Sequence, residues 1–256
     1  MFSSLIKIPL LKRIIPSLGL KILKILKKNR GYFKIKDTKM FLDFLDPIDR
    51  QIILNQEYEK IEINYLIKEI KKNNIIHFID IGANCGYYSI FIAKNISNIT
   101  IESYEPNKEA FFKFKKTLEI NPVLREKINV YNFGLSAQKR ELKMQSMVKH
   151  GYSQTGGSAV IENISYENFD VYDAQFEIGD KIINQNKNTI AIKIDVEGHE
   201  INVLKGLKNT IINNKIIIQI EIFEKNFKKV NNFLTSLDYK IIYEIKERSN
   251  YFYSNI

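Results

Sequence analysis

The segment FIDIGANCGYYSI (78–90) decides the fold of this chain. It reads as a buried strand, a glycine-rich turn and a helix that begins near Gly86, which is the context of a nucleotide-binding turn. The dinucleotide pattern G-x-G-x-x-G is absent, because asparagine occupies position 84, where that pattern needs glycine. Asn84 tolerates a left-handed backbone, and Gly82 allows a ligand to approach the main chain closely.

Two acidic side chains accompany this turn. Asp80 ends a buried strand, where a carboxylate is costly unless it is paired, so a cationic ligand suits the position better than a pyrophosphate. Glu105 ends the next apolar strand, ITIESYE (99–105), where a carboxylate can accept hydrogen bonds from both hydroxyls of a ribose. Asn107 follows as the predicted N-cap of a helix. The pattern predicts a nucleoside site, and the alternative is a purely structural turn.

Strands and helices alternate along the rest of the chain. We predict strands at 75–81, 99–105, 128–133, 189–196, 215–223 and 239–245, and helices at 86–95, 107–119, 198–211 and 225–237. Residues 41–73 are predicted to be helical, and residues 139–180 irregular. Apolar strands that alternate with helices predict an α/β fold with a mostly parallel central sheet flanked by helices.

A second polar group follows from strand periodicity. On the strand predicted at 189–196, Lys193 and Asp195 face one way and the isoleucines the other, and Glu221 occupies the matching face of the strand at 215–223. Open α/β sheets bind ligands at the carboxyl ends of their strands. Because buried charges must be paired, we expect Lys193, Asp195 and Glu221 to form a cluster.

The helix predicted from residue 198 adds candidates to this cluster. Glu200 lies in its first turn on the buried side, where it either serves the site or satisfies free main-chain amides. His199 lies at the edge of that face and is either a base or a surface residue. Glu197, which precedes the helix, is included in the polar group around Lys193.

The formal net charge of +10 is concentrated at the N-terminus. Residues 1–40 hold eleven basic residues and one acidic residue, so the remainder, with 28 of each sign, is neutral. A neutral body argues against a wide nucleic-acid interface. Ser17 can cap a helix over 18–28 with lysines on one side and aliphatic residues on the other. Such a basic arm over 1–40 predicts contact with anionic membranes, or alternatively a helix packed on the body.

Compartment is indicated by two simple features. Cys85 is the single cysteine, which excludes an intrachain disulfide and fits a reducing environment. No apolar run reaches transmembrane length, and lysines interrupt the N-terminal apolar stretch. We therefore expect a cytoplasmic protein that contacts the inner face of the membrane through its arm.

In order along residues 57–245, the sequence resembles the FkbM family of methyltransferases. The shared motifs are EYEK (57–60), FIDIGANCGYYS (78–89), YEPN (104–107), NFGLS (132–136), IKIDVEGHEINVLKG (192–206) and IEIF (220–223). The resemblance implies a Rossmann-like class I methyltransferase domain over 41–256, S-adenosyl-L-methionine as donor, and O-methylation of a sugar or another hydroxyl. It implies donor-binding roles for Asp80, Gly82, Asn84, Gly86 and Glu105, to which we add Asn107, and it implies that Asp195 is an active-site acid.

Methyl transfer to a hydroxyl requires alignment and one base. Asp195 is the first choice as base and His199 the second, with Glu200 as a further candidate. No spacing typical of metal ligands is present, so no required metal is predicted. The expected acceptor is a glycan or glycolipid rather than a nucleic acid.

Two alternatives belong to other classes of protein. A nicotinamide-dependent oxidoreductase on a similar sheet is disfavoured by the missing G-x-G-x-x-G pattern. A non-catalytic binding protein on a methyltransferase fold is disfavoured by the intact turn and by Glu105.

Overall fold

In the computed structural model, the described residues are 29–149, 152–161 and 168–256. The amphipathic helix expected over 18–28 lies outside them, so the membrane contact of the arm stays a prediction. Within the described ranges, no helix combines the length and apolar character needed to cross a membrane.

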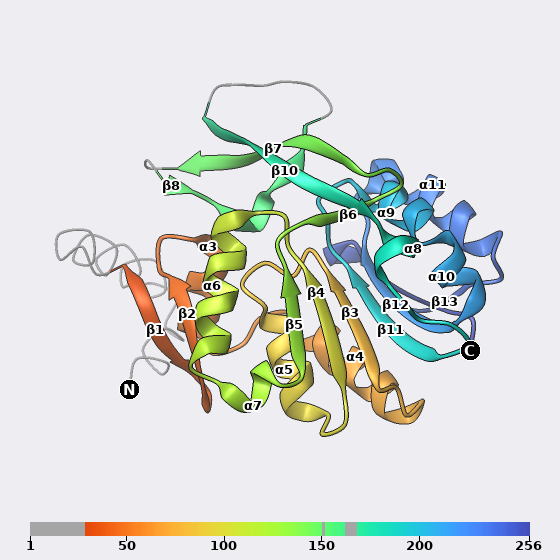
Figure 1. Ribbon diagram of the computed structural model, residues 1–256, viewed down its shortest axis with the longest axis horizontal. Coiled ribbons are helices and arrows are strands. Elements are labelled where there is room, and N and C mark those ends of the chain that lie inside the picture. Colours follow the sequence, from red (N-terminus) through yellow and green to blue (C-terminus); the bar gives the residue numbers. More distant parts are fainter. Residues whose placement is uncertain (1–28, 150–151, 162–167) are drawn as a thin grey trace.

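The centre of the molecule is a seven-stranded sheet in the order β13-β14-β12-β11-β3-β4-β5 (Figure 1). Its strands are β3 (His77–Ile81), β4 (Thr100–Tyr104), β5 (Ile128–Tyr131), β11 (Thr189–Ile194), β12 (Lys215–Glu221), β13 (Lys240–Ile245) and β14 (Asn250–Ser254). The first five are parallel to one another, whereas β14 pairs antiparallel with β12 and β13. The mostly parallel sheet is confirmed, but the sequence analysis missed β14.

Helices cover both faces of this sheet. One hydrophobic core includes residues of α4 (Lys60–Lys72), α5 (Tyr87–Asn95), α6 (Lys108–Glu119) and α7 (Pro122–Arg125). The other includes residues of α9 (Glu200–Gly206), α10 (Lys208–Asn213) and α11 (Glu224–Thr235), with α8 (Gly179–Ile182) beside it. Ala191 belongs to the first core and Ile190 and Ile192 to the second, so the predicted alternation along β11 is confirmed.

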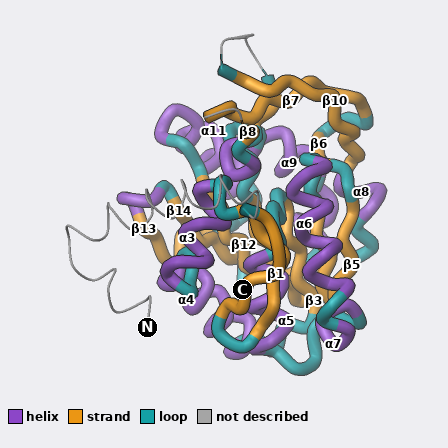
Figure 2. Tube along the Cα trace, turned by 90° about the vertical axis from the view of Figure 1, so that its left-hand side faces the viewer, coloured by secondary structure: helices purple, strands orange, loops and turns teal. Residues whose placement is uncertain are grey.

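The helical prediction for 41–73 is confirmed by α3 (Pro47–Asn55) and α4, except at 41–43, where a strand ends. That strand, β2 (Thr38–Asp43), forms an antiparallel hairpin with β1 (Arg30–Ile35) beside α6 (Figure 2). Ile35 and Met40 are fully buried in the core. Burial, rather than polarity, alternates along β2, where Thr38, Met40 and Leu42 are buried. The fold therefore already includes residues 30–40 of the expected arm.

The prediction that residues 139–180 are irregular is wrong. They supply most of a second sheet, the inserted sheet, made of β6 (Gly134–Ser136), β7 (Arg140–Lys149), β8 (Tyr152–Ser153), β9 (Ala159–Val160) and β10 (Phe169–Ile178). It lies above the carboxyl ends of β3, β4 and β5 (Figure 1). Its core is small, with Met144, Ala174 and Phe176 buried, which is why its strands resemble polar loops in sequence.

Candidate functional site

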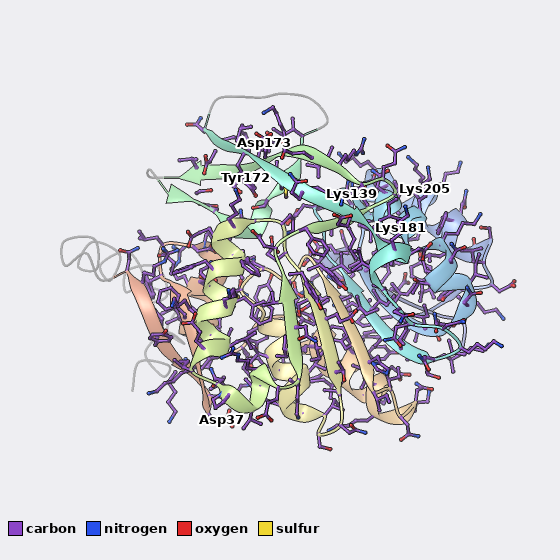
Figure 3. The ribbon with its side chains drawn as sticks, viewed as in Figure 1. Asp37, Lys139, Tyr172, Asp173, Lys181 and Lys205 are labelled. Carbon is purple, nitrogen blue, oxygen red and sulfur yellow. The ribbon has the colours of Figure 1, made fainter. Side chains whose placement is uncertain are left out.

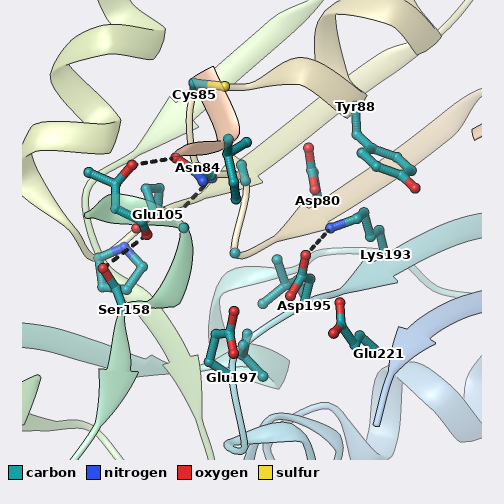
Figure 4. Close-up of a pocket in the computed structure, with 18 of the residues that line it drawn as sticks. Asp80, Asn84, Cys85, Tyr88, Glu105, Ser158, Lys193, Asp195, Glu197 and Glu221 are labelled. Carbon is teal, nitrogen blue, oxygen red and sulfur yellow. Dashed lines mark hydrogen bonds and ion pairs between the residues drawn. The ribbon is translucent and has the colours of Figure 1, made fainter. Parts of the chain in front are cut away.

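A cavity of about 490 Å³ lies at the carboxyl ends of β3, β4, β11 and β12, and the inserted sheet lines part of it (Figure 4). Nine of the predicted site residues line it: Asp80, Gly82, Asn84, Glu105, Lys193, Asp195, Glu197, His199 and Glu221. Gly86, Asn107 and Glu200 do not. The two polar groups predicted from separate parts of the sequence therefore share one cavity.

The glycine-rich turn has the left-handed backbone that its sequence predicts. Gly82 and Gly86 have φ angles of 81°, and Asn84 has a φ of 49°. A Cβ atom on Gly82 would collide with the carbonyl oxygen of Asp195, and one on Gly86 would collide with the ring of Phe114. Glycine is thus required at position 82 because the main chain that follows β11 lies against it. The sequence alone does not reveal this contact.

Glu105 connects the glycine-rich turn to the end of β4 through hydrogen bonds. Its Oε2 accepts a hydrogen bond from the main-chain N–H of Asn84 at 2.7 Å, and its Oε1 accepts one from Asn107 at 2.7 Å. Burial raises the pKa of Glu105 to about 7, although both hydrogen bonds act in the opposite direction. Each carboxylate oxygen keeps a further lone pair with which it can bind hydroxyl groups in the cavity.

Asp80 is fully buried, and only one of its oxygens has a partner. Oδ2 accepts a hydrogen bond from the Ser89 hydroxyl at 2.6 Å, whereas Oδ1 has none among the described residues. Burial raises the pKa of Asp80, with the charge of Lys193 opposing this effect. An unsatisfied buried carboxylate oxygen in a cavity favours a ligand that supplies a hydrogen-bond donor or a positive charge.

Lys193 joins the two polar groups. Register places it beside Asp80 on β3, and its Nζ lies 2.8 Å from Oδ2 of Asp195 (Figure 4). Burial lowers the pKa of Lys193, but the charges of Asp195, Asp80 and Glu59 outweigh burial and raise it. Glu221 lines the same cavity near this ion pair (Figure 4), and burial and then the charge of Asp195 raise its pKa to about 8. The structure therefore brings the expected cluster of Lys193, Asp195 and Glu221 together.

Glu59 and Thr155 line the cavity and were not identified as site residues from the sequence. Glu59 precedes α4 with a left-handed backbone, and its Oε2 accepts a hydrogen bond from the Tyr88 hydroxyl at 2.7 Å. The EYEK motif that contains Glu59 was the available signal. Thr155 begins the 3₁₀ turn Thr155–Gly157, which connects β8 to β9 of the inserted sheet, and its hydroxyl lies 3.1 Å from the amide oxygen of Asn84.

Asn107 has a structural position rather than one on the cavity wall. Its Oδ1 accepts hydrogen bonds from the N–H groups of Glu109 and Ala110, so the predicted N-cap is confirmed. Its Nδ2 donates to the hydroxyls of Tyr172 and Ser158 at 2.7 and 3.1 Å, on the inserted sheet. Figure 3 shows Tyr172 on β10. Asn107 therefore attaches the inserted sheet to the start of α6.

The two residues at the start of α9 differ in their surroundings. Glu200 accepts hydrogen bonds from the main-chain N–H of Gly198 at 2.6 Å and from Asn226 at 3.1 Å, which matches the structural alternative. His199 lines the cavity, with Nε2 3.0 Å from the Ser136 hydroxyl. Burial lowers the pKa of His199 to about 4, so at neutral pH this side chain is an uncharged and weak base.

The strand order and the glycine-rich turn define an α/β fold of the class I methyltransferase type. Residues 80–241 match the model of the methyltransferase FkbM domain. This match covers more than half of the chain, which therefore belongs to the FkbM methyltransferase family. The family counts against the alternative of a nicotinamide-dependent oxidoreductase.

Comparison with individual proteins gives more distant similarities. The chain is 24% identical over 165 residues to the hexuronic acid methyltransferase AglP of Haloferax volcanii, a match that covers 62% of this chain and 60% of that protein. The structure of methyltransferase FkbM from Methylobacillus flagellatus KT is 17% identical with a TM-score of 0.49, covering 71% of this chain and 44% of that one. Precorrin-6y C5,15-methyltransferase from Geobacter metallireducens GS-15 is 11% identical with a TM-score of 0.44, covering 87% and 97%.

Proposed function

We propose that this chain uses S-adenosyl-L-methionine to methylate a hydroxyl group of a sugar in a glycan or glycolipid. The observation that carries the proposal is the buried Oδ1 of Asp80, which has no partner in the described part of the chain and lies beneath the glycine-rich turn of an FkbM domain. Similarity to a hexuronic acid methyltransferase of Haloferax volcanii supports a sugar acceptor.

The residues present fit the proposed donor. Asp80 would bind its ammonium group, Glu105 would accept hydrogen bonds from its ribose hydroxyls, and the turn from Gly82 to Asn84 would lie against it. The donor supplies a methyl group that is already activated by a sulfonium. The protein therefore needs to orient the two reactants, exclude water and remove one proton.

Asp195 is the proposed base. It lines the cavity, and Lys193 binds its Oδ2, while its Oδ1 has no hydrogen-bond partner among the described residues. Lys193 thus fixes the orientation of the carboxylate and leaves one oxygen to accept the proton of the acceptor hydroxyl. Ser136 and Asn202 occupy the two ring nitrogens of His199, which makes this residue a weaker candidate.

We expect micromolar binding of S-adenosyl-L-methionine and of its demethylated product, measured by titration calorimetry. Asp80→Asn should weaken donor binding by about 1–3 kcal/mol, because a neutral amide binds an ammonium less strongly than a carboxylate does. Asp173→Asn, in an exposed ion pair with Lys143, is the control and should bind the donor normally. Tight binding of NAD without binding of either sulfur compound would contradict the proposal.

Asp195→Asn should keep the donor affinity and lower turnover by about 10²–10⁴-fold, the usual contribution of one general base. Donor consumption against sugar and glycolipid pools, with mass spectrometry of the products, gives the turnover. Glu200→Gln is the comparison and should keep turnover, since Glu200 does not line the cavity. If donor binding collapses in Asp195→Asn while turnover of the bound fraction persists, Asp195 belongs to the donor site.

A further inference from the structure

The cavity wall carries more negative than positive charge. Six acidic side chains line it, and the basic side chains of its wall, within the described ranges, are Lys193 and Arg248. Lys193 is paired with Asp195, and Arg248 binds Glu62 at 2.8 Å. The proposed donor has one net positive charge, from its ammonium, sulfonium and carboxylate groups. Donor binding therefore leaves an excess of negative charge in the cavity.

The excess is concentrated at Glu59, Glu197 and Glu221. Figure 4 shows Glu197 and Glu221 near the ion pair of Lys193 and Asp195. Burial and then the charge of Asp195 raise the pKa of Glu197 to about 7 and that of Glu221 to about 8. The charge of Lys193 lowers both pKa values but does not outweigh burial and Asp195, so a further bound cation is favoured there.

The aromatic side chains of the cavity wall also suit a cationic ligand. The ring of Tyr88 already faces a cation, because Nζ of Lys193 lies 4.6 Å from its centroid, and Tyr58 also lines the cavity. Aromatic rings combined with carboxylates are typical of sites that bind organic ammonium groups.

The spacing of the acids fits an organic cation better than a metal ion. Throughout the described residues, no three acidic, histidine or cysteine side chains come close enough together to hold one metal ion. An organic ammonium with neighbouring hydroxyl groups presents donors at several positions, so carboxylates that do not converge on one point can each bind a different donor. Glu59 precedes α4, Glu197 follows β11 and Glu221 ends β12, which is such a spread arrangement.

We propose that the acceptor is a sugar that carries a protonated amine near the methylated hydroxyl, and that the negative charge of Glu59, Glu197 and Glu221 on the cavity wall attracts this amine. The proposal rests on the methyltransferase function proposed above and specifies the chemical class of its substrate. It separates this chain from its relative that acts on hexuronic acid, because an acidic sugar would bring a further carboxylate into this cavity.

The test uses the full chain saturated with S-adenosylhomocysteine and three matched sugars. These are the methyl glycosides of glucosamine, glucose and glucuronic acid, which differ mainly in charge, titrated calorimetrically at pH 7.5. We expect the glucosamine derivative to bind at least about tenfold more tightly than the glucose derivative, and the glucuronic acid derivative to bind most weakly. The preference should diminish at high salt.

The double variant Glu197→Gln/Glu221→Gln should reduce the preference for the amine to about twofold or less, with unchanged affinity for S-adenosylhomocysteine. The matched control is Glu119→Gln/Glu126→Gln, two acids outside the cavity wall. Thermal denaturation establishes that both variants are folded.

The outcomes separate the two proposals. Failure to bind S-adenosylhomocysteine would overturn the methyltransferase function itself. Normal binding of that compound, combined with equal binding of the three glycosides, no binding of any, or preference for the acidic sugar, would overturn only the amine-bearing acceptor.

Discussion

Replacing Lys113 by methionine is expected to lower the free energy of unfolding by about 3–5 kcal/mol, because it leaves buried carboxylates without their counter-ion. Nζ of Lys113 lies 2.6 Å from Oδ2 of Asp49 and 3.4 Å from Oδ2 of Asp46. All three side chains are buried, and the pKa of Asp49 is raised by burial to about 6 even with the lysine present. Chemical denaturation measures the loss.

Two companion variants make this result specific. Lys115→Met changes an exposed lysine of the same helix and should have little effect on stability. Lys113→Met/Asp49→Asn should recover part of the loss, since it removes one unpaired charge together with the lysine. Equal stability of Lys113→Met and Lys115→Met would show that the buried charges do not depend on Lys113.

The same substitution should also weaken donor binding, because Lys113 supports the inserted sheet. Nζ of Lys113 donates to the Thr155 hydroxyl at 3.1 Å, and the main-chain N–H of Thr155 donates to Asp46 at 3.0 Å. Thr155 in turn contacts Asn84 of the glycine-rich turn. Loss of the lysine therefore weakens the contact between Thr155 and the glycine-rich turn, both of which line the cavity.

The second large effect concerns pH. At pH 8.5, Glu197→Gln/Glu221→Gln is expected to be more stable than the parent by about 2–4 kcal/mol, and at pH 5 the difference should largely disappear. The pKa values of Glu197 and Glu221 are raised in the folded protein to about 7 and about 8, from 4.5 in the unfolded chain. Between these values the folded state binds more protons, so stability falls as the pH rises.

Comparing variant with parent at each pH isolates these two groups. Other residues titrate over the same range, among them Glu105, but they are common to both proteins and cancel in the difference. Denaturant titrations at several pH values supply the data, with Glu119→Gln/Glu126→Gln as the variant whose difference should not depend on pH. A cavity variant less stable than the parent at pH 8.5 would mean that these carboxylates are compensated in the folded protein.

The sequence predicted those elements whose residues are buried on a continuous face. The parallel strands were found because apolar runs such as 189–196 have no other stable place than inside a sheet. The final strand, β14, was missed because it is only five residues long and follows β13 after a single short 3₁₀ turn, Lys246–Arg248. The inserted sheet was missed because its solvent-facing residues, such as Asp173, dominate its composition.

The site residues also fall into those that the sequence could place and those that it could not. Asp80, Lys193 and Asp195 could be placed together, because the carboxyl ends of parallel strands meet at one edge of a sheet. The position of Thr155 could not, since it depends on contacts with α3 and α6 that lie far away in sequence. The buried side of a helix can face a cavity or satisfy main-chain amides, and the sequence does not distinguish the two, so Glu200 is among the predicted candidates.

The close contact at Gly82 determines which parts of such a domain can vary in sequence. The main-chain N–H of Gly82 donates to Tyr104 at 2.9 Å, that of Asp195 donates to Ile81 at 3.0 Å, and the carbonyl of Asp195 lies against the Cα of Gly82. Three neighbouring strand ends are thus joined by backbone alone. The distance between the glycine-rich turn and the loop that begins at Asp195 is therefore set by the main chain and does not depend on side-chain rotamers. If Glu197 and Glu221 bind the acceptor as proposed, we expect substitutions there to change which molecule is accepted without altering this main-chain geometry.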